Sequence, residues 1–492
     1  MKSRALSRQS PEAKYNRMTT EPVEKLILKL AVPTIISMLV TAFYNLADTF
    51  FIRQLNSDSM VAAIGVVMPL MNIIQAIGFY HGHGSGNYIS RAFGRRDLKD
   101  AEKMAATGFF CAVSFGILLA AVGLCFRRGF AGLLGAKTEE TMENTIRYMR
   151  YILLAAPLMM GSIVMNNQLR FQGNAFFSMI GLTSGAVLNL ILDPLLIFRA
   201  GDAIGIAGLH ARFGAGMGVS GAALATAISQ CVSFTILAIG MQRSDNVKIH
   251  LKNFCPNAFY LKGIMQGGLP SLARQGITSI SSASLNHAIG LYVAGAVMID
   301  AAQAAMTGVN RIMMVLASIL IGFGQGFQPV CGFNYGAQKY DRVRRAFWFC
   351  VRLAAVVLVA LSALGFVFAG PITNLVTGAS PEASRIAVFA FRAQLLTLPL
   401  SAWIVLCNMM LQNIGATAKA TMLAVSRQGL AFIPMVLLLP LLAEALGMAP
   451  VLGIELAQPF ADLISALIAI PIGTGELKKM AAQEGADPPS TE

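Results

Sequence analysis

The chain has 492 residues, of which 55% are hydrophobic and only 13% are charged. Soluble globular domains carry about 25% charged residues, so this composition excludes an ordinary soluble protein and indicates an integral membrane protein. The formal net charge of +14 could suggest a nucleic-acid partner. The basic residues, however, are distributed among the loops between apolar segments, and nucleic-acid binding is therefore excluded.

Twelve apolar segments follow one another along the chain. Each is long enough, at about 20 residues, to cross a bilayer as a helix. Together they predict an all-α integral membrane protein. Their approximate cores are residues 28–52, 60–80, 104–126, 148–168, 176–198, 218–240, 267–292, 302–322, 347–369, 386–410, 420–441 and 450–472.

Lysine and arginine are distributed unevenly between alternate loops. If the N-terminus is cytoplasmic, the segments on the inside hold 24 of these residues and the segments on the outside hold eight. Such an excess follows the positive-inside rule. It predicts a multi-pass protein of the cell (inner) membrane, with residues 1–25 and 474–492 as cytoplasmic tails.

The two halves of the sequence resemble each other, because five landmarks recur in the same order at offsets of 237 to 242 residues. This duplication predicts two six-helix bundles, residues 26–240 and 263–473, joined by a cytoplasmic linker, residues 241–262. Each half has an even number of spans, so the bundles should be related by a pseudo-two-fold axis along the membrane normal. The matched landmarks are Pro33 with Pro270, Gly84-Ser85-Gly86 with Gly324-Gln325-Gly326, Gly94 with Gly336, Pro157 with Pro399, and Gly173 with Gly415.

Two acidic residues lie inside apolar segments of the first half. Asp193 follows Asn189 by four residues, and Asp48 follows Asn45 by three, so each acid shares a helix face with an amide. A carboxylate at the centre of a membrane helix costs about 2.5–3.5 kcal/mol on insertion scales and usually marks an ion or substrate pathway. The pattern therefore predicts a site that binds and releases a small cation.

The second half lacks this pair of acids. The repeat offset carries Asp48 to Leu285 and Asp193 to Met435. Both residues are apolar and cannot bind a cation through their side chains. Coupling chemistry is therefore expected in the first half alone.

Two prolines are candidate hinges. Pro194 directly follows Asp193, and Pro33 lies near the start of the first apolar segment. A proline removes a backbone donor and can kink a helix. The alternative is tolerated packing of proline in a membrane helix.

Five short motifs occur in a specific order along the chain. They are Tyr44-Asn45-Leu46-Ala47-Asp48-Thr49, Asn189-Leu190-Ile191-Leu192-Asp193-Pro194, Gly221-Ala222-Ala223-Leu224-Ala225-Thr226, Gly324-Gln325-Gly326-Phe327-Gln328-Pro329 and Asn334-Tyr335-Gly336-Ala337. In this order they resemble the multidrug and toxic compound extrusion (MATE) family of antiporters, most closely its DinF-like and MepA-like bacterial branch. The resemblance covers roughly residues 22–475. It implies the MATE-like fold and a secondary active multidrug efflux transporter, which exchanges H+ or Na+ for amphipathic, cationic organic compounds by alternating access.

The resemblance also implies an inner cation site in the N-terminal bundle. Carboxylate, amide and hydroxyl oxygens form a cage that suits Na+, whereas burial away from water would let the same carboxylates carry a proton. The alternatives are a buried hydrogen-bonded pair of acids without a transport role and, for the supporting residues, hydrogen bonding between helices. The residues expected to couple H+ or bind Na+ are Asp48, Asn189, Asp193 and Thr226, with Asn45, Tyr148 and Asn166 in support.

Signals for the substrate are weaker. Phe43 and Tyr44 could present aromatic faces to organic cations, and Arg274 lies within the seventh apolar segment; these three residues are candidates for the substrate cleft. No nucleotide-binding motif is present, so an ion gradient is expected to supply the energy in place of ATP, and no cofactor is expected. The expected partners are small organic molecules and the lipid bilayer, and the expected state is a monomer.

Two other functions are alternatives to efflux. A flippase of the same superfamily, for lipid-linked oligosaccharides or polyprenyl diphosphates, would line its cleft with arginines, and Arg274, Arg311 and Arg392 keep this alternative open. An intramembrane enzyme would need clustered aspartates for Mg2+ and diphosphate, or the residue sets of a protease. The sequence contains neither arrangement, so the protein is not expected to be an enzyme.

Overall fold

A computed structural model describes residues 11–53, 57–201, 214–243, 247–377 and 380–485, and the side chains of residues 45–49 lie outside the described part. These segments form helices joined by short connections. The β-pairing within them is a single isolated antiparallel bridge between Arg199 and Ala215. The all-α fold that the sequence predicts is therefore confirmed.

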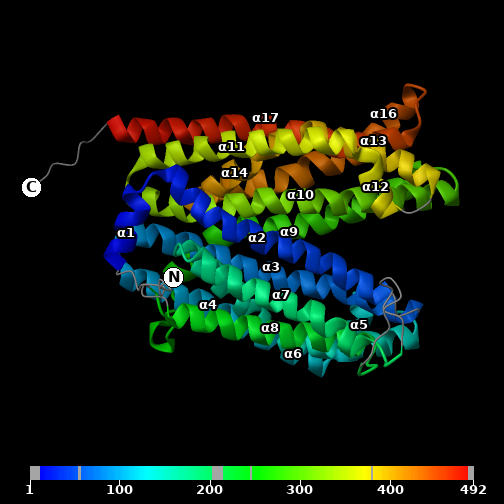
Figure 1. Ribbon diagram of the computed structural model, residues 1–492, viewed down its shortest axis with the longest axis horizontal. Coiled ribbons are helices and arrows are strands. Elements are labelled where there is room, and N and C mark those ends of the chain that lie inside the picture. The colour runs from blue at the N-terminus through cyan, green and yellow to red at the C-terminus, as the bar shows by residue number, and fades with distance from the viewer. Residues whose placement is uncertain (1–10, 54–56, 202–213, 244–246, 378–379, 486–492) are drawn as a thin grey trace, which may run out of the picture. The chain divides into compact units, whose positions relative to one another are not determined.

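Helices α1 to α8 occupy the first half of the chain (Figure 1). Among them, α3, α4 and α6 pack against one another, and α8 lies against α6 and α7. The pair α7 and α8 carries the polar cluster described below. The bounds are α1 (Pro11–Thr20), α2 (Val23–Arg53), α3 (Asp58–Gly94), α4 (Leu98–Cys125), α5 (Arg127–Leu134), α6 (Glu139–Phe171), α7 (Ala175–Ile197) and α8 (Val219–Arg243).

The second half follows after a short 3-10 turn, η1 (Leu251–Asn253), and contains one π-helical segment, η2 (Ser426–Ala431). Here α10 packs against α13 and α14, and α17 packs against α13, α14 and α16. The bounds are α9 (Ala258–Tyr292), α10 (Ala296–Gly336), α11 (Tyr340–Val367), α12 (Ala369–Thr377), α13 (Pro381–Thr397), α14 (Leu400–Ile414), α15 (Thr417–Val425), α16 (Phe432–Ala445) and α17 (Pro450–Gly485).

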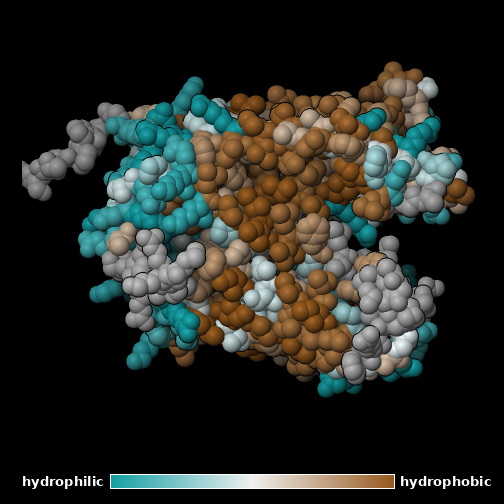
Figure 2. All heavy atoms as spheres, in the orientation of Figure 1, coloured by the Kyte–Doolittle hydropathy of each residue, from teal (hydrophilic) through white to brown (hydrophobic). Residues whose placement is uncertain are grey.

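Each of the twelve predicted apolar segments falls on these helices. Within the described residues, ten helical stretches are long and apolar enough to cross a membrane, and α13 with α14, bent by 58°, form an eleventh. The twelfth segment is α9, whose polar side chains include Lys262 and Arg274. Figure 2 shows hydrophobic side chains over the middle of α11 and α17 and hydrophilic ones where α17 ends. This surface is typical of helices that lie in lipid.

The chain packs into two compact units whose boundaries lie inside two long helices. Unit 1 comprises Met1–Thr20 and Val32–Gly268, and unit 2 comprises Glu21–Ala31 and Leu269–Glu492. The first turns of α2 therefore pack in unit 2, and the first turns of α9 pack in unit 1. In both helices the second residue after the change of unit is a proline, Pro33 in α2 and Pro270 in α9.

Repeated glycines make room for these first turns. A β-carbon on Gly84 of α3 would lie 2.3 Å from the carbonyl oxygen of Ile264 in α9. A β-carbon on Gly326 of α10 would lie 2.5 Å from the Cα of Ala31 in α2. Such distances are too short for any side chain, so glycine is required at both positions for the helices to approach this closely. In each unit one glycine of the recurring landmark therefore lies against the first turns of a long helix that changes units, the first glycine in unit 1 and the last glycine in unit 2.

Of two other pairs of landmarks, the glycine pair has the same structure in both halves and the proline pair does not. Gly173 and Gly415 both adopt left-handed backbone conformations, with φ of +81° and +84°, just beyond the ends of α6 and α14. Glycine ends helices in this way because it lacks a β-carbon. Pro157, by contrast, lies inside an unbroken α6, whereas its counterpart Pro399 separates α13 from α14. Prolines at matched positions of the repeat therefore have different effects on their helices.

Candidate functional site

Asp193 is fully buried in α7 and is held by the amide of Asn189. The exposed fractions of the two residues are 0% and 2%. The Asn189 Nδ2 lies 3.3 Å from Asp193 Oδ1, and in the opposite orientation of the amide it donates to Asp193 Oδ2 at 3.1 Å. The four-residue spacing read from the sequence thus places amide and carboxylate in contact on one helix face.

Helix α8 brings Thr226 to the same amide. With one orientation of the amide, Asn189 Nδ2 donates to Thr226 Oγ1 at 3.4 Å; with the other, its oxygen accepts from the Thr226 backbone N–H at 3.2 Å. The two helices approach closely because Gly221 of α8 lies against Leu196 of α7, where a β-carbon would be 2.3 Å from the carbonyl oxygen. A carboxylate, an amide and a hydroxyl from two helices therefore meet inside unit 1.

The loop after α7 holds the end of this helix in place. Proline removes the donor that would bond a carbonyl one turn earlier, and Pro194 lies in the last turn of α7. The backbone N–H groups of residues 215–218 donate to the carbonyls of residues 195–198, at 2.9 to 3.1 Å. The end of α7, one turn beyond Asp193, is thereby tied to the start of α8.

This cluster offers two ways to hold a cation. The carboxylate of Asp193, the amide oxygen of Asn189 and the hydroxyl of Thr226 are hard oxygen ligands of the kind that Na+ accepts. Binding Na+ would require the amide to turn its oxygen towards the ion. A proton can instead reside on the carboxyl group while the amide keeps its hydrogen bonds.

The other residues predicted for the cation site lie in helices α2 and α6. Asn45 and Asp48 belong to α2, but their side chains lie outside the described residues, and their part in the site stays a prediction. In α6, the Tyr148 hydroxyl donates to Met71 Sδ at 3.9 Å. The Asn166 Nδ2 donates to the Ser178 carbonyl oxygen at 3.0 Å and so links α6 to α7.

The contacts of Tyr148 and Asn166 are hydrogen bonds between helices, which was the alternative to a role in cation binding. The Tyr148 ring is 1% exposed and belongs to the hydrophobic core cluster of unit 1. Asn166 positions the first turn of α7, the helix that carries Asp193. Asn166 therefore links α6 to the helix that carries Asp193, and a supporting role of Tyr148 in cation binding stays a prediction.

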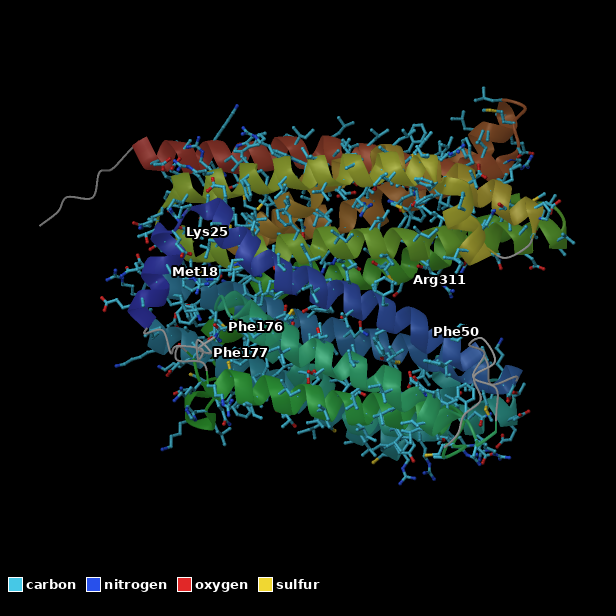
Figure 3. The ribbon with its side chains drawn as sticks, in the orientation of Figure 1. Met18, Lys25, Phe50, Phe176, Phe177 and Arg311 are labelled. Atoms are coloured by element: carbon cyan, nitrogen blue, oxygen red, sulfur yellow. The ribbon has the colours of Figure 1, made fainter. Side chains whose placement is uncertain are left out.

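The candidates for the substrate cleft differ in exposure. Phe43 on α2 is 59% exposed, whereas Tyr44 and Arg274 are partly buried. Phe50 of α2 and Phe176 of α7 are also exposed (Figure 3). Exposed aromatic side chains alone do not define a cleft, so this assignment stays a prediction.

Unit 2 contains a buried acid of a different kind. Asp462 of α17 is 0% exposed. Arg427 of η2 donates two hydrogen bonds to its carboxylate, from Nε to Oδ1 at 2.7 Å and from Nη2 to Oδ2 at 3.3 Å. Gln458 Nε2 donates to Oδ1 at 2.8 Å, and Thr397 Oγ1 lies 3.4 Å from Oδ2. A permanent guanidinium therefore satisfies Asp462, and no exchangeable cation is needed there. An acid inside an apolar segment is expected to pair with a neighbouring arginine, and the fold confirms this for Asp462 and shows that its partner is Arg427.

A family model described as MatE matches the chain twice, over residues 33–195 and 276–438. The two matches cover corresponding parts of the two halves. The duplication that the landmarks indicate is therefore confirmed.

Curated relatives match over most of the chain. The multidrug export protein MepA of Staphylococcus aureus (strain MSSA476) is 26% identical over 423 residues, which cover 85% of this chain and 87% of that protein. MepA of Staphylococcus haemolyticus (strain JCSC1435) is 26% identical over 417 residues, covering 84% and 86%.

Solved structures agree with these relatives. The crystal structure of MATE in complex with MaL6 has a TM-score of 0.83 and 25% identity, and the match covers 95% of this chain and 99% of that one. An outward-facing multidrug resistance MATE family transporter of the MOP superfamily has a TM-score of 0.83 and 25% identity over 95% and 98% of the two chains.

Proposed function

The chain belongs to the MatE family of multidrug efflux transporters, and from this premise we propose that it exports amphipathic, cationic organic compounds in exchange for H+ or Na+ by alternating access. Family membership makes the protein a multi-span membrane transporter and not an enzyme. The direction of transport, the coupling ion and the class of substrate are the proposed parts.

The buried cluster around Asp193 carries this proposal. A charged carboxylate inside a membrane helix is unfavourable by a few kcal/mol, and arrival of one H+ or one Na+ removes that penalty. A ligand shifts a conformational equilibrium only if it binds one state better than the other. Asp193 meets this condition if water reaches it in one state and not in the other, and the cation then drives the state that releases substrate.

We place the protein in the inner membrane with both termini in the cytoplasm. The excess of lysine and arginine on alternate loops supports this orientation. Loops 95–97 and 337–339, between α3 and α4 and between α10 and α11, would then face the cytoplasm. Both are short, and basic residues occur in or beside them.

We assign the hinges to the points where α2 and α9 change units. Pro33 was predicted from the sequence, and Pro270 is its counterpart in the repeat. A helix shared by two units must bend when the units move, and a residue without an N–H leaves one carbonyl without its helical partner. Bending there breaks no hydrogen bond of the ladder.

Replacing both hinge prolines by alanine is expected to slow export. The Pro33→Ala/Pro270→Ala variant gains a helical hydrogen bond at each position. One such bond contributes about 0.5–1.5 kcal/mol, so turnover should fall two- to tenfold for each bond while substrate affinity changes little. Initial export rates in proteoliposomes measure this. Pro69→Ala, an exposed proline inside α3 and within unit 1, is the control, and an unchanged double variant would contradict the hinge assignment.

Removing the Thr226 hydroxyl is expected to weaken cation binding. Thr226→Val keeps the shape of the side chain and loses one oxygen ligand. The cation concentration for half-maximal export should rise by about two- to tenfold, the effect of one hydrogen bond, and Thr226→Ser should stay close to wild type. Titrating the driving cation in a transport assay measures this. A valine variant with the wild-type cation dependence would place Thr226 outside the site.

The primary test is transport by the wild-type protein in proteoliposomes. A fluorescent organic cation is followed under an imposed Na+ gradient and then under an imposed H+ gradient. We expect one gradient to drive transport and so to name the ion. Absence of driven transport for several organic cations under both gradients would overturn the proposal.

That outcome would favour the lipid-diphosphate flippase. One observation already weighs against it, because a flippase would direct its arginines towards a diphosphate. The Arg392 Nε is instead held by the Phe366 carbonyl oxygen at 3.3 Å, with the guanidinium 5.1 Å from the Phe366 ring. The antiporter is therefore preferred.

A further inference from the structure

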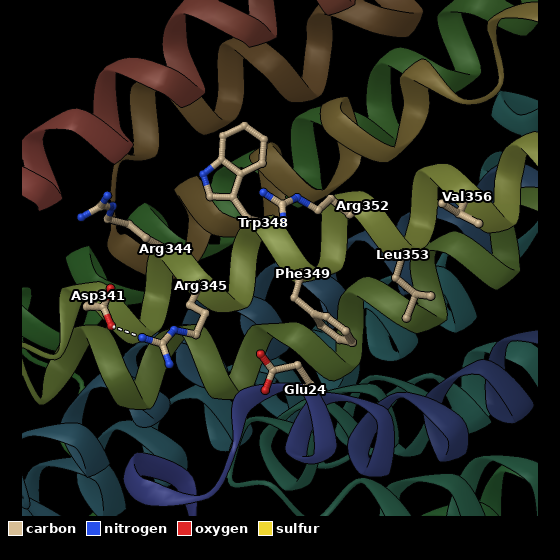
Figure 4. A pocket seen from close by; sticks show the side chains of 9 residues that line it. All are labelled: Glu24, Asp341, Arg344, Arg345, Trp348, Phe349, Arg352, Leu353 and Val356. Atoms are coloured by element: carbon tan, nitrogen blue, oxygen red, sulfur yellow. Dashed lines mark hydrogen bonds and ion pairs between the residues drawn. The ribbon is translucent and has the colours of Figure 1, made fainter.

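A cavity of about 600 Å3 lies along the first half of α11 in unit 2 (Figure 4). Its lining runs along one face of this helix at intervals of three and four residues, so polar and apolar groups follow one another in order from the helix start. One residue of α2 completes the wall. The lining residues are Glu24, Asp341, Arg344, Arg345, Trp348, Phe349, Arg352, Leu353 and Val356.

Most charges of this cavity are already paired. The Arg344 Nη1 lies 3.2 Å from an oxygen of Glu484, and the Arg345 Nη2 lies 3.0 Å from an oxygen of Asp341. Glu24 interacts electrostatically with the neighbouring Arg342. The lining therefore has one positive charge left over once these pairs are counted.

That charge belongs to Arg352. No carboxylate among the described residues lies within ion-pair distance of it, and its guanidinium lies 6.0 Å from the centre of the Trp348 ring. Figure 4 shows the side chain extending towards Trp348, that is, towards the start of α11. Long side chains on helices point in this direction, and arginines in membrane helices extend towards the polar interface in the same way.

The position of Arg352 in the helix makes this charge informative. It lies about 18 Å along α11 from Tyr340, at 1.5 Å per residue, within a helix apolar enough to cross a membrane. Val356, one turn further, is 67% exposed, and Leu353 lines the same cavity. Trp348 is 40% exposed, and tryptophan is enriched where lipid headgroups meet hydrocarbon.

We propose that this cavity binds an anionic glycerophospholipid from the leaflet on the side where α11 begins. The lipid phosphate would lie against Arg352, the headgroup would extend towards Arg345 and Arg344, and the acyl chains would follow Leu353 and Val356. A phospholipid accounts for both features of the cavity, the arginine side chain without an acidic partner and the apolar wall that continues into the membrane. A free phosphate ion matches only the first. The proposal rests on α11 crossing the membrane and not on the coupling ion.

Fluorescence of the wild-type protein tests the site directly. The chain has two tryptophans, Trp348 and Trp403, with ring centres 5.5 Å apart. Phosphatidylglycerol brominated on its acyl chains should quench their emission at lower mole fractions than brominated phosphatidylcholine with the same chains. Equal quenching by the two lipids would overturn the proposal.

Native mass spectrometry of the full-length protein then tests whether Arg352 itself, and not only the folded cavity, selects the lipid. We expect wild type to retain phosphatidylglycerol in preference to phosphatidylcholine. In the Arg352→Gln variant the ratio of bound phosphatidylglycerol to bound phosphatidylcholine should fall about fivefold, the effect of one arginine near anionic lipid. Arg352→Lys should keep most of this preference. Arg392→Gln, an arginine of unit 2 outside this cavity, is the matched control.

Two results would overturn the proposal in this assay. The first is an unchanged preference in Arg352→Gln. The second is displacement of phosphatidylglycerol by millimolar inorganic phosphate, which would show a site for the ion alone. A transport assay that fails for every organic cation would leave these lipid results unaffected, so the two proposals fail separately.

Discussion

Replacing Asp193 by asparagine is expected to abolish gradient-driven export, down to the leak of liposomes without protein. The substitution keeps the shape of the side chain and its contact with Asn189, but an amide can neither take up a proton nor balance the charge of Na+. Without a carboxylate, the cation no longer binds one conformation of the protein more tightly than the other. The gradient then cannot shift the equilibrium between the two conformations. The measurement is uptake of a fluorescent organic cation under the gradient that drives wild type.

The variant should nevertheless fold. A carboxylate in a membrane helix carries a cost of about 2.5–3.5 kcal/mol, so removing the charge should leave the thermal midpoint unchanged or raise it. Asp300→Asn changes an exposed acid near the start of α10 and should transport as wild type does. Wild-type export by Asp193→Asn would show that the coupling ion binds elsewhere, and the side chain of Asp48 would be examined next.

Replacing Arg427 by leucine is expected to cause the largest loss of stability. The guanidinium makes two of the contacts of the buried Asp462 carboxylate, at 2.7 and 3.3 Å. Removing one partner of a buried ion pair leaves an uncompensated charge and costs about 3–5 kcal/mol. For a unit of this size the loss corresponds to a fall of about 10 °C in the unfolding midpoint. Fluorescence-detected size-exclusion chromatography after heating measures that midpoint.

The double variant Arg427→Leu/Asp462→Leu separates charge from packing. Replacing a whole buried pair by apolar residues is often neutral or stabilising, so most of the lost stability should return. If the single variant unfolds at the wild-type temperature, the pair contributes no stability. If the double variant is as unstable as the single one, the loss comes from packing and not from the unpaired charge.

Much of the fold was predictable from local chemistry. The transfer of a helix into lipid depends on the sum of its side chains and on its length. The twelve predicted segments could therefore be read from the chain, and within the described residues eleven of them coincide with helical stretches that are long and apolar enough to cross a membrane. The contact between Asn189 and Asp193 was predictable for a similar reason, because residues four apart share a helix face. Gly173 and Gly415 were recognisable as landmarks because their helix ends require a left-handed backbone.

Contacts between helices were not predictable in this way. The repeat paired Pro157 with Pro399, yet one lies in a continuous helix and the other at a 58° bend. That Asp462 would pair with an arginine was expected from its apolar segment, but only the fold shows that Arg427 is the partner. The sequence placed residues 26–31 in the first bundle and residues 263–268 in the second. In the structure residues 26–31 pack in unit 2 and residues 263–268 pack in unit 1.

The physical reason is the range of the interactions involved. Hydropathy, helix-face periodicity and glycine at helix ends act within a few residues, so the chain order alone reveals spans, duplication and the acid of α7. Ion pairing, the close approach of α7 and α8 at Gly221, and the unmatched charge of Arg352 depend on residues far apart in the chain. Their free energies exist only once the helices have packed, and only the packed structure shows them.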